Sequence, residues 1–152
     1  MKVAQIGTGG WGKNHTRILS QLGVLCAVCD VNKERSKEYA EKYSVSSYDS
    51  VDTLLDSEKF DAALICTPTS THSQTATQLI QKKKNVFIEK PLTYNSEEGE
   101  DLLELAKKNN VLMTCGYIER FNPAVGLVKD YVKSKKYGEF VKFKHHKFTI
   151  FF

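Results

Sequence analysis

The first twelve residues constrain the fold of this chain more than any other stretch. A short apolar run, 3–6, leads directly into the turn Gly7-x-Gly9-x-x-Gly12, and a helix is predicted from 15 to 21. A second apolar run, 25–30, then ends on Asp30, 18 positions after Gly12. A strand, a glycine turn, a helix, a strand and an acidic residue in this order are typical of a dinucleotide-binding α/β unit. The alternative is a plain glycine turn between two buried strands.

Each glycine of this turn has a physical role in such a unit. Gly7 ends the strand in a tight turn, Gly9 lets the backbone approach a pyrophosphate, and Gly12 lets the helix lie close to the strand. The start of the helix presents free N–H groups and a partial positive charge to the phosphates. We therefore predict that the whole loop binds the cofactor: Gly7, Thr8, Gly9, Gly10, Trp11 and Gly12.

Asp30 predicts which dinucleotide binds. At the end of the second strand, its carboxylate can accept hydrogen bonds from both ribose hydroxyls, whereas it would repel a 2′-phosphate. NAD is therefore the expected cofactor, and NADP is the less favoured alternative. Lys33 and Arg35 lie close enough in the sequence to weaken that preference.

Composition limits the class of protein. The 152 residues suit one domain of ordinary size, and contents of 41% hydrophobic and 26% charged residues are typical of a soluble globular protein. The net charge of +4 is small, and the densest basic run, 82–84, falls where a helix should end, so we expect no nucleic-acid partner. No apolar stretch approaches the roughly 18 residues of a membrane span. No signal peptide precedes the first strand, and we expect a cytoplasmic protein without membrane contact.

The four cysteines, Cys26, Cys29, Cys66 and Cys115, all lie in apolar runs. Cys26 and Cys29 fall within a predicted strand, where residues three apart point to opposite faces and cannot share a metal ion. We therefore predict no metal site, and we interpret the cysteines as small core residues of a reduced, cytoplasmic protein.

Strand and helix patterns alternate through most of the chain. Apolar runs predict strands over 3–6, 25–30, 46–48, 61–66, 86–88 and 111–116. Amphipathic or capped segments predict helices over 15–21, 33–43, 51–55, 71–83, 97–109 and 123–135. Asn32 and either Asn95 or Ser96 are the expected N-caps. Unbroken apolar strands that alternate with helices predict an α/β fold, a Rossmann-type doubly wound parallel sheet.

The composition changes after Gly138, where the last residues become aromatic and basic and alternate like a strand. A terminal strand this hydrophobic would leave an unpaired edge. We therefore expect a dinucleotide-binding domain over 1–118. Residues 119–152 would then form a connecting helix and the first strand of an incomplete second α/β domain. That strand is also the candidate edge for a homo-oligomer.

A second candidate motif follows the strand predicted over 61–66, at the edge where open α/β sheets bind their ligands. The segment Cys66-Thr67-Pro68-Thr69 carries hydroxyl groups that can line the cofactor cleft or cap the next helix. His72, three residues further on, is either a ligand contact or a surface or capping residue.

A third motif, Glu89-Lys90-Pro91, follows the strand predicted over 86–88. A lysine fixed by a following proline can hold the nicotinamide ribose or a substrate hydroxyl and can influence a proton transfer. The alternative for this tripeptide alone is an exposed lysine before a turn.

A fourth motif, residues 116–123, follows the last strand of the predicted sheet. It places an acid, a base, an amide and two aromatic rings in one strand-to-helix turn. Such a density of polar groups suits recognition of a hydroxyl-rich ligand. Glu119, Arg120 and Asn122 are therefore candidate substrate contacts, and a structural ion pair between Glu119 and Arg120 is the alternative.

Together these motifs resemble the N-terminal half of Gfo/Idh/MocA family oxidoreductases. The resemblance rests on the glycine turn with Asp30, the Cys-Thr-Pro…His segment at 66–72, Glu89-Lys90-Pro91 and the Gly-Tyr-x-Glu-Arg-Phe-Asn-Pro stretch at 116–123. It covers residues 1–140 in the family's order and spacing. The wording of 118–123 is similar to that of members acting on nucleotide-linked amino sugars.

The resemblance implies hydride transfer between NAD(P) and a carbinol carbon of a sugar, a nucleotide sugar or a cyclitol. It implies that Lys90 is catalytic and touches both substrate and cofactor. It also implies a set of cofactor contacts beyond the glycine turn and Asp30, namely Cys66, Thr67, Pro68, Thr69, His72, Glu89 and Lys90.

The family's second domain supplies an Asp-x-x-x-His element whose histidine acts as general acid and base, and His145-His146 does not match it. Two hypotheses follow. The chain is the cofactor-binding portion of an oxidoreductase, inactive by itself, or it is a non-catalytic dinucleotide-binding module or subunit completed by a partner chain.

Overall fold

The computed structural model describes residues 1–136, 138–139, 143–144 and 149–150. The chain divides into two compact units, Met1–Gly116 and Tyr117–Phe152, and each is described by itself. The domain boundary expected after residue 118 stays a prediction.

The first unit is built on one sheet of six parallel strands. The strands are β1 (Val3–Ile6), β2 (Leu25–Cys29), β3 (Ser46–Tyr48), β4 (Ala62–Ile65), β5 (Asn85–Ile88) and β6 (Met113–Cys115). Their order across the sheet is β3-β2-β1-β4-β5-β6, and every neighbouring pair is parallel. This order reverses direction between β1 and β4, as in a doubly wound dinucleotide-binding sheet. The Rossmann-type fold predicted from the sequence is confirmed.

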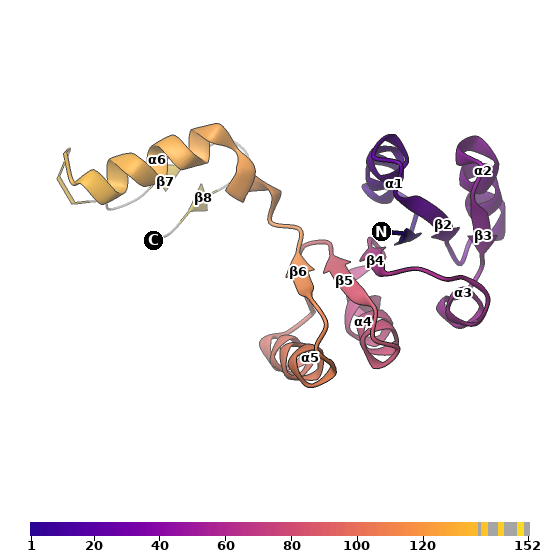
Figure 1. Cartoon of the computed structure of the whole chain (residues 1–152). Helices are drawn as coiled ribbons and strands as arrows, with labels where there is room; N and C mark the ends of the chain where they lie inside the picture. The colour runs from indigo at the N-terminus through magenta and orange to yellow at the C-terminus, as the bar shows by residue number, and fades with distance from the viewer. Residues whose placement is uncertain (137, 140–142, 145–148, 151–152) are drawn as a thin grey trace. The chain divides into compact units, whose positions relative to one another are not determined.

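Helices cover both faces of this sheet (Figure 1). The helices α1 (Gly12–Gln21) and α2 (Lys33–Tyr43) lie on one face, and α3 (Val51–Ser57), α4 (His72–Gln81) and α5 (Ser96–Asn109) lie on the other. A 3-10 turn, η1 (Thr69–Thr71), precedes α4. Because helices shield both faces, most residues of the central strands are buried, and β1 is buried along its whole length.

Five of the six predicted helices differ from their expected bounds by one to three residues at an end, and only α2 agrees at both ends. The first helix begins at Gly12, three residues earlier than expected, because the last glycine of the turn already has helical backbone. The helix expected over 71–83 ends at Gln81, since Lys83 adopts a positive φ of 57° that no helix can contain.

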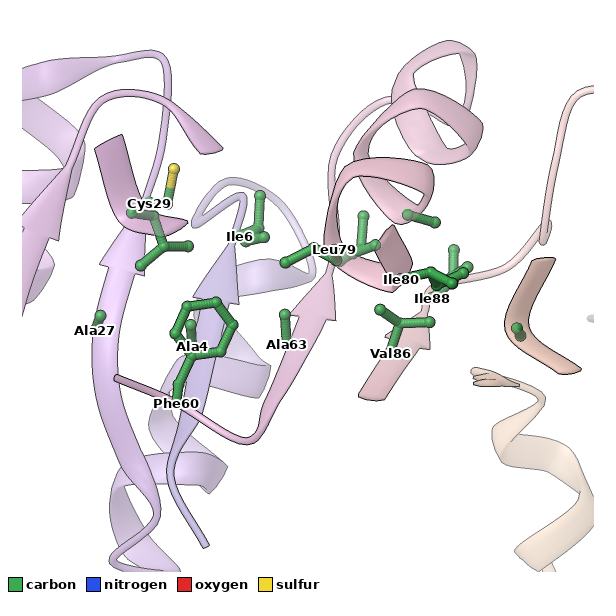
Figure 2. Packing of buried hydrophobic residues seen from close by; sticks show 14 of the residues in the cluster. Ala4, Ile6, Ala27, Cys29, Phe60, Ala63, Leu79, Ile80, Val86 and Ile88 are labelled. Carbon is green, nitrogen blue, oxygen red and sulfur yellow. The ribbon is translucent and has the colours of Figure 1, made fainter. Parts of the chain in front are cut away.

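The core lies between the sheet and the helices of the second face (Figure 2). Small and branched residues of the four central strands meet Leu79 and Ile80 of α4, and Leu102 of α5 closes the layer. Small alanines such as Ala4 and Ala27 let α-helical side chains approach the sheet closely.

Side-chain caps fix where the helices begin. Asn32 accepts a hydrogen bond from the N–H of Arg35 at 3.0 Å, and α2 covers the residues predicted for it. Asn95 accepts one from the N–H of Glu98 at 2.9 Å. Of the two alternatives for the cap of α5, Asn95 is therefore the correct one.

The cysteines are free thiols and are less buried than predicted. Cys29 is buried, but Cys26, Cys66 and Cys115 are half-buried. Their interpretation as core residues is thus correct for Cys29 and incomplete for the others. The cytoplasmic location inferred from them stays a prediction. In the described part of the chain, no helix is both long enough and apolar enough to cross a membrane.

The second unit contains a 3-10 turn, η2 (Ile118–Phe121), and the helix α6 (Pro123–Ser134). Two short strands, β7 (Phe143–Lys144) and β8 (Thr149–Ile150), pair antiparallel. The single strand expected after Gly138 is therefore wrong in its described part, because β8 returns alongside β7. The remaining residues of that strand, 140–142, 145–148 and 151–152 with His145 and His146, lie outside the described residues. Pairing of two copies through this segment stays a prediction.

Candidate functional site

A cavity of about 750 Å³ lies in the first unit, where strands β1, β2, β4 and β5 end. Its volume is in the range of small-molecule and cofactor sites. Most of the predicted cofactor contacts line it, namely Gly7, Gly9, Gly10, Trp11, Asp30, Cys66, Thr67, Pro68, Glu89 and Lys90. Four other predicted contacts, Thr8, Gly12, Thr69 and His72, are not among the lining residues.

The glycine turn is shaped by close backbone contacts at Gly7 and Gly12. Gly7 has a φ of 81°, and a Cβ there would overlap the carbonyl group of Cys66. A Cβ on Gly12 would overlap the carbonyl oxygen of Gly7, with the carbonyl carbon only 2.8 Å away. The side-chain amide of Gln5 donates to the same carbonyl oxygen at 2.8 Å. The close approach of helix to strand expected at Gly12 is therefore real.

Gly9 differs from these two glycines because no backbone crowds it. The nearest atom to a Cβ built there is the Nη1 atom of Arg35, at 3.0 Å, which ends a flexible side chain. The bare backbone of Gly9 therefore faces the cavity, as a close-lying pyrophosphate requires.

The N-terminus of α1, with the partial positive charge of its helix dipole, also lies at this cavity. Trp11 occupies the N-cap position, and in the described chain no side chain caps it and no acidic residue falls in the first turn. The partial positive charge of the helix end is thus left for a ligand. Together with Gly9, this end of α1 fits the phosphates of a dinucleotide.

Asp30 is held rigidly beside the glycine turn. One oxygen, Oδ2, accepts hydrogen bonds from the N–H and the hydroxyl of Thr8, both at 2.9 Å, and the other, Oδ1, accepts the N–H of Asn32 at 3.0 Å. Burial by itself would raise the pKa of the Asp30 carboxyl, but these hydrogen bonds and the charge of Arg35 outweigh it and lower the pKa. The carboxylate is therefore ionised and oriented, and Oδ1 keeps acceptor capacity for a ribose hydroxyl.

Arg35 lines the cavity next to this carboxylate. Its Nη1 atom lies 3.4 Å from Oδ2 of Asp30 and above Gly9. This end of the cavity thus carries one negative and one positive group within contact distance of each other.

The turn after β4 contributes Cys66, Thr67 and Pro68 to the opposite wall. Burial, and then the negative charge of Glu89, raises the pKa of the Cys66 thiol to about 11. This thiol is therefore neutral at physiological pH and acts as a small apolar lining group. The hydroxyl of Thr71 donates to that of Thr67 at 2.8 Å and fixes the turn.

His72 lies behind that wall and not on the surface. Only 1% of the residue is exposed, so the alternative of a surface residue is wrong. Its Nε2 and Nδ1 atoms each lie 3.0 Å from a backbone carbonyl oxygen, those of Thr67 and Pro91. The ring thus ties the turn after β4 to the turn after β5. Contact with a ligand stays a prediction.

Lys90 is exposed and lines the cavity at the end of β5. The peptide bond between Lys90 and Pro91 is cis. Because β5 is separated from β1 by β4, this lysine lies on the far side of the glycine turn from Asp30. The cavity therefore has the Asp30 carboxylate and the Arg35 guanidinium at one end and the Lys90 ammonium at the other.

The candidate substrate contacts belong to the second unit. Asn122 caps α6 by accepting the N–H of Ala124 at 3.0 Å, and it donates to Oε2 of Glu119 at 2.9 Å. The structural ion pair between Glu119 and Arg120 is not formed within the described residues, since Glu119 bonds Asn122 instead. Substrate contact by Glu119, Arg120 and Asn122 stays a prediction.

Sequence reasoning missed the wall of the cavity formed by the loop after β3, the start of α3, the turn η1 and the helix α4. The residues concerned are Asp49, Ser50, Val51, Asp52, Thr71, Gln74, Thr75 and Gln78. The local sequence of these residues is that of an ordinary helix start or helix surface and gives no signal of a binding role. They reach the site only because of the order of the strands in the sheet. Among the described residues, no three His, Cys, Asp or Glu side chains lie where they could share a metal ion.

Comparison with known sequences also indicates a dinucleotide-binding domain. Residues 1–117 match an oxidoreductase family with an NAD-binding Rossmann fold. The UDP-N-acetylglucosamine 3-dehydrogenase of Acidithiobacillus ferrooxidans is 35% identical over 125 residues, which are 82% of this chain and 39% of that protein. The myo-inositol 2-dehydrogenase of Thermotoga maritima is 32% identical over 142 residues, which are 91% of this chain and 42% of that protein. The chain thus spans about two fifths of the length of these curated relatives.

Solved structures show the same arrangement. The A. ferrooxidans dehydrogenase aligns with a TM-score of 0.79 at 34% identity, over 86% of this chain and 41% of that chain. The WlbA dehydrogenase of Bordetella pertussis, solved in complex with NADH and UDP-GlcNAcA, aligns with a TM-score of 0.85 over 91% of this chain and 44% of that chain. Its identity is 24%, so this second likeness concerns the fold alone.

Proposed function

Because the chain belongs to the Gfo/Idh/MocA oxidoreductase family, we propose that its cavity binds a nicotinamide dinucleotide for hydride exchange with a sugar or cyclitol. One observation carries the proposal: three features line the same cavity. They are the uncrowded backbone of Gly9, the N-terminus of α1, which no side chain among the described residues caps, and the ionised carboxylate of Asp30. Phosphates fit the first two, and ribose hydroxyls fit the third.

The strand order suggests how the dinucleotide would lie. Asp30 follows β2, the glycine turn follows β1, and Lys90 follows β5 on the other side of β4. An adenosine at Asp30 and a pyrophosphate at the turn would direct the nicotinamide end toward Lys90. A bound nicotinamide supplies or accepts the hydride, and the exposed ammonium of Lys90 would hold a ribose or substrate hydroxyl beside it.

We propose NAD as the preferred cofactor. The ionised Asp30 carboxylate would repel a 2′-phosphate, whereas the neighbouring Arg35 guanidinium would attract one. The carboxylate is the more firmly held of the two, since three further hydrogen bonds orient it. Replacement of Arg35 by methionine should therefore weaken NADPH binding while NADH binding is retained.

Trp11 provides a direct test because it is the only tryptophan of the chain, lines the cavity and is 60% exposed. Titration of NADH into the 152-residue chain should quench Trp11 emission and produce sensitised NADH emission that saturates. Gly9→Val should abolish this signal, because its side chain would occupy the pyrophosphate position. Gly126→Ala is the matched control, since a Cβ there meets no atom within 4 Å.

Unchanged NADH affinity in the Gly9→Val variant would contradict the proposed site. Turnover is measured separately, with UDP-N-acetylglucosamine and myo-inositol as oxidisable substrates. Saturable binding with turnover would support an oxidoreductase active as it stands. Binding without turnover would favour the non-catalytic module or a portion that needs a second domain.

A further inference from the structure

A largely buried pair of ionisable side chains, His15 and Glu89, borders the cavity, and the bond between them has no role in the contacts proposed so far. The Nε2 atom of His15, on α1, lies 2.8 Å from Oε1 of Glu89, at the end of β5. The two side chains are only 19% and 12% exposed. The ring of His15 also packs against that of Phe87, with the centroids 5.8 Å apart. The pair therefore joins the phosphate-facing helix to the strand that carries Lys90.

The second oxygen of Glu89 reaches the backbone of Lys90 itself. Oε2 accepts the N–H of Lys90 at 2.9 Å. A Cβ at position 116 would lie 3.1 to 3.2 Å from the three carboxylate atoms, so any residue larger than Gly116 would have to displace the carboxylate by a few tenths of an ångström. Glu89 is thus bonded to His15 of α1 and packed against Gly116 at the end of β6. It in turn accepts the backbone N–H of Lys90.

The residue that follows Lys90 is held as well. The carbonyl oxygen of Pro91 lies 3.0 Å from Nδ1 of the buried His72 at the start of α4. The backbone on both sides of Lys90 is therefore anchored to a helix that borders the cavity, while the lysine side chain remains exposed.

We propose that His15 and Glu89 are positioning residues that couple phosphate binding at α1 to the placement of Lys90 at the nicotinamide end. This inference rests on the proposed function. A ligand bound at the start of α1 would immobilise the first turn of this helix, from Gly12 to His15. His15 would then hold the Glu89 carboxylate in place, and that carboxylate accepts the N–H of Lys90. The coupling needs no direct contact between the pair and the nicotinamide.

The test compares NADH with ADP, which has the adenosine and the phosphates but no nicotinamide half. Both are titrated by calorimetry into the 152-residue chain and its variants. Glu89→Ala and His15→Phe, which keeps a ring against Phe87, should each lower NADH affinity about tenfold, the worth of one lost hydrogen bond. ADP affinity should stay within about twofold, and the double variant should be no weaker than either single one.

Glu89→Gln separates hydrogen bonding from charge and is the conservative variant. Its amide can still accept from Lys90 and donate to His15, so NADH affinity should return to within about threefold of the original. Equal losses of NADH and ADP affinity in Glu89→Ala would overturn the inference, since they would indicate general damage to the site. Additive losses in the double variant would also overturn it.

A measurement on the unaltered chain keeps the inference testable if a variant fails to fold. Saturation with ADP should slow hydrogen exchange at the Lys90 amide by up to about twofold, since linkage makes this factor equal to the loss of ADP affinity in Glu89→Ala, although ADP has no group at the nicotinamide end. Unchanged exchange at this amide under saturation would contradict the coupling. Failure of the unaltered chain to bind either nucleotide would instead refute the proposed function, and the inference with it.

Discussion

Gly7 and Gly12 are needed for close backbone packing, whereas Gly9 and Gly10 line the cavity without backbone crowding. A Cβ on either of the first two would collide with a backbone carbonyl group, which cannot move without shifting β4 or the turn itself. A Cβ on Gly10 meets nothing within 4 Å. The spacing of the motif predicts structural roles for Gly7 and Gly12 and a ligand-facing role for Gly9, and the packing adds the close carbonyl contacts that explain the first two.

Replacement of Gly12 by alanine should therefore destabilise the chain. The added methyl group forces α1 away from the carbonyl of Gly7, at a cost of about 1–3 kcal/mol in the free energy of unfolding. Urea denaturation measures the change, and Gly10→Ala is the matched control with an expected change below about 0.5 kcal/mol. Equal stability of the two variants would contradict this division of roles.

Asp30 should make the stability of the chain depend on pH at the acid end. Its pKa is lowered by folding from 3.8, so the ionised carboxylate stabilises the folded state above that value. This stabilisation is lost as the pH falls below 3.8 and through the folded-state pKa. Asp30→Asn should lower the free energy of unfolding by about 1–3 kcal/mol at pH 7.

The difference between Asp30→Asn and the original chain should then shrink steadily below pH 3.8. Urea denaturation at a series of pH values measures it. A constant difference from pH 7 down to pH 2 would mean that the Asp30 charge contributes nothing to folding. NADH affinity at pH 7 should also fall in this variant, since the ribose loses a charged acceptor.

At the scale of elements, boundaries set by local side-chain chemistry were predictable and others were not. The helix α2 covers the residues predicted for it because Asn32 caps its start. The end of α4 was missed because Lys83, a residue without turn propensity, adopts the left-handed backbone that ends the helix. The wall formed by α4 and the loop after β3 could not be predicted, since it depends on which strands become neighbours.

The end of α2 offers a stabilising substitution. Ser44 caps this helix with a φ of 55° and a ψ of 48°, a left-handed conformation that disfavours any residue with a Cβ. Ser44→Gly should raise the free energy of unfolding by up to about 1 kcal/mol. Ser57→Gly, at a right-handed helical position in α3, is the control and should not stabilise. If Ser57→Gly raised the free energy of unfolding as much as Ser44→Gly, relief of the left-handed backbone at Ser44 could not be the cause of the gain.

At the scale of the whole molecule, every residue lining the cavity belongs to the first unit. A chain shortened to residues 1–118 should therefore fold cooperatively and bind NADH within about twofold of the 152-residue chain. Energy transfer from Trp11 measures the affinity, and denaturation followed by circular dichroism measures the folding. Loss of NADH binding in a folded 1–118 chain would show that the second unit contributes to the cofactor site.

The central position of β1 has a consequence for how the chain folds. Val3 pairs with Leu25 on one side and with Ala62 on the other, so the second neighbour of this strand is 59 residues away in the sequence. Closing so long a loop costs more chain entropy than forming the local helices. Gly7 also rests against the carbonyl of Cys66, just beyond β4. During synthesis, the glycine turn emerges before β4 and would thus acquire its final shape only after β4 has emerged.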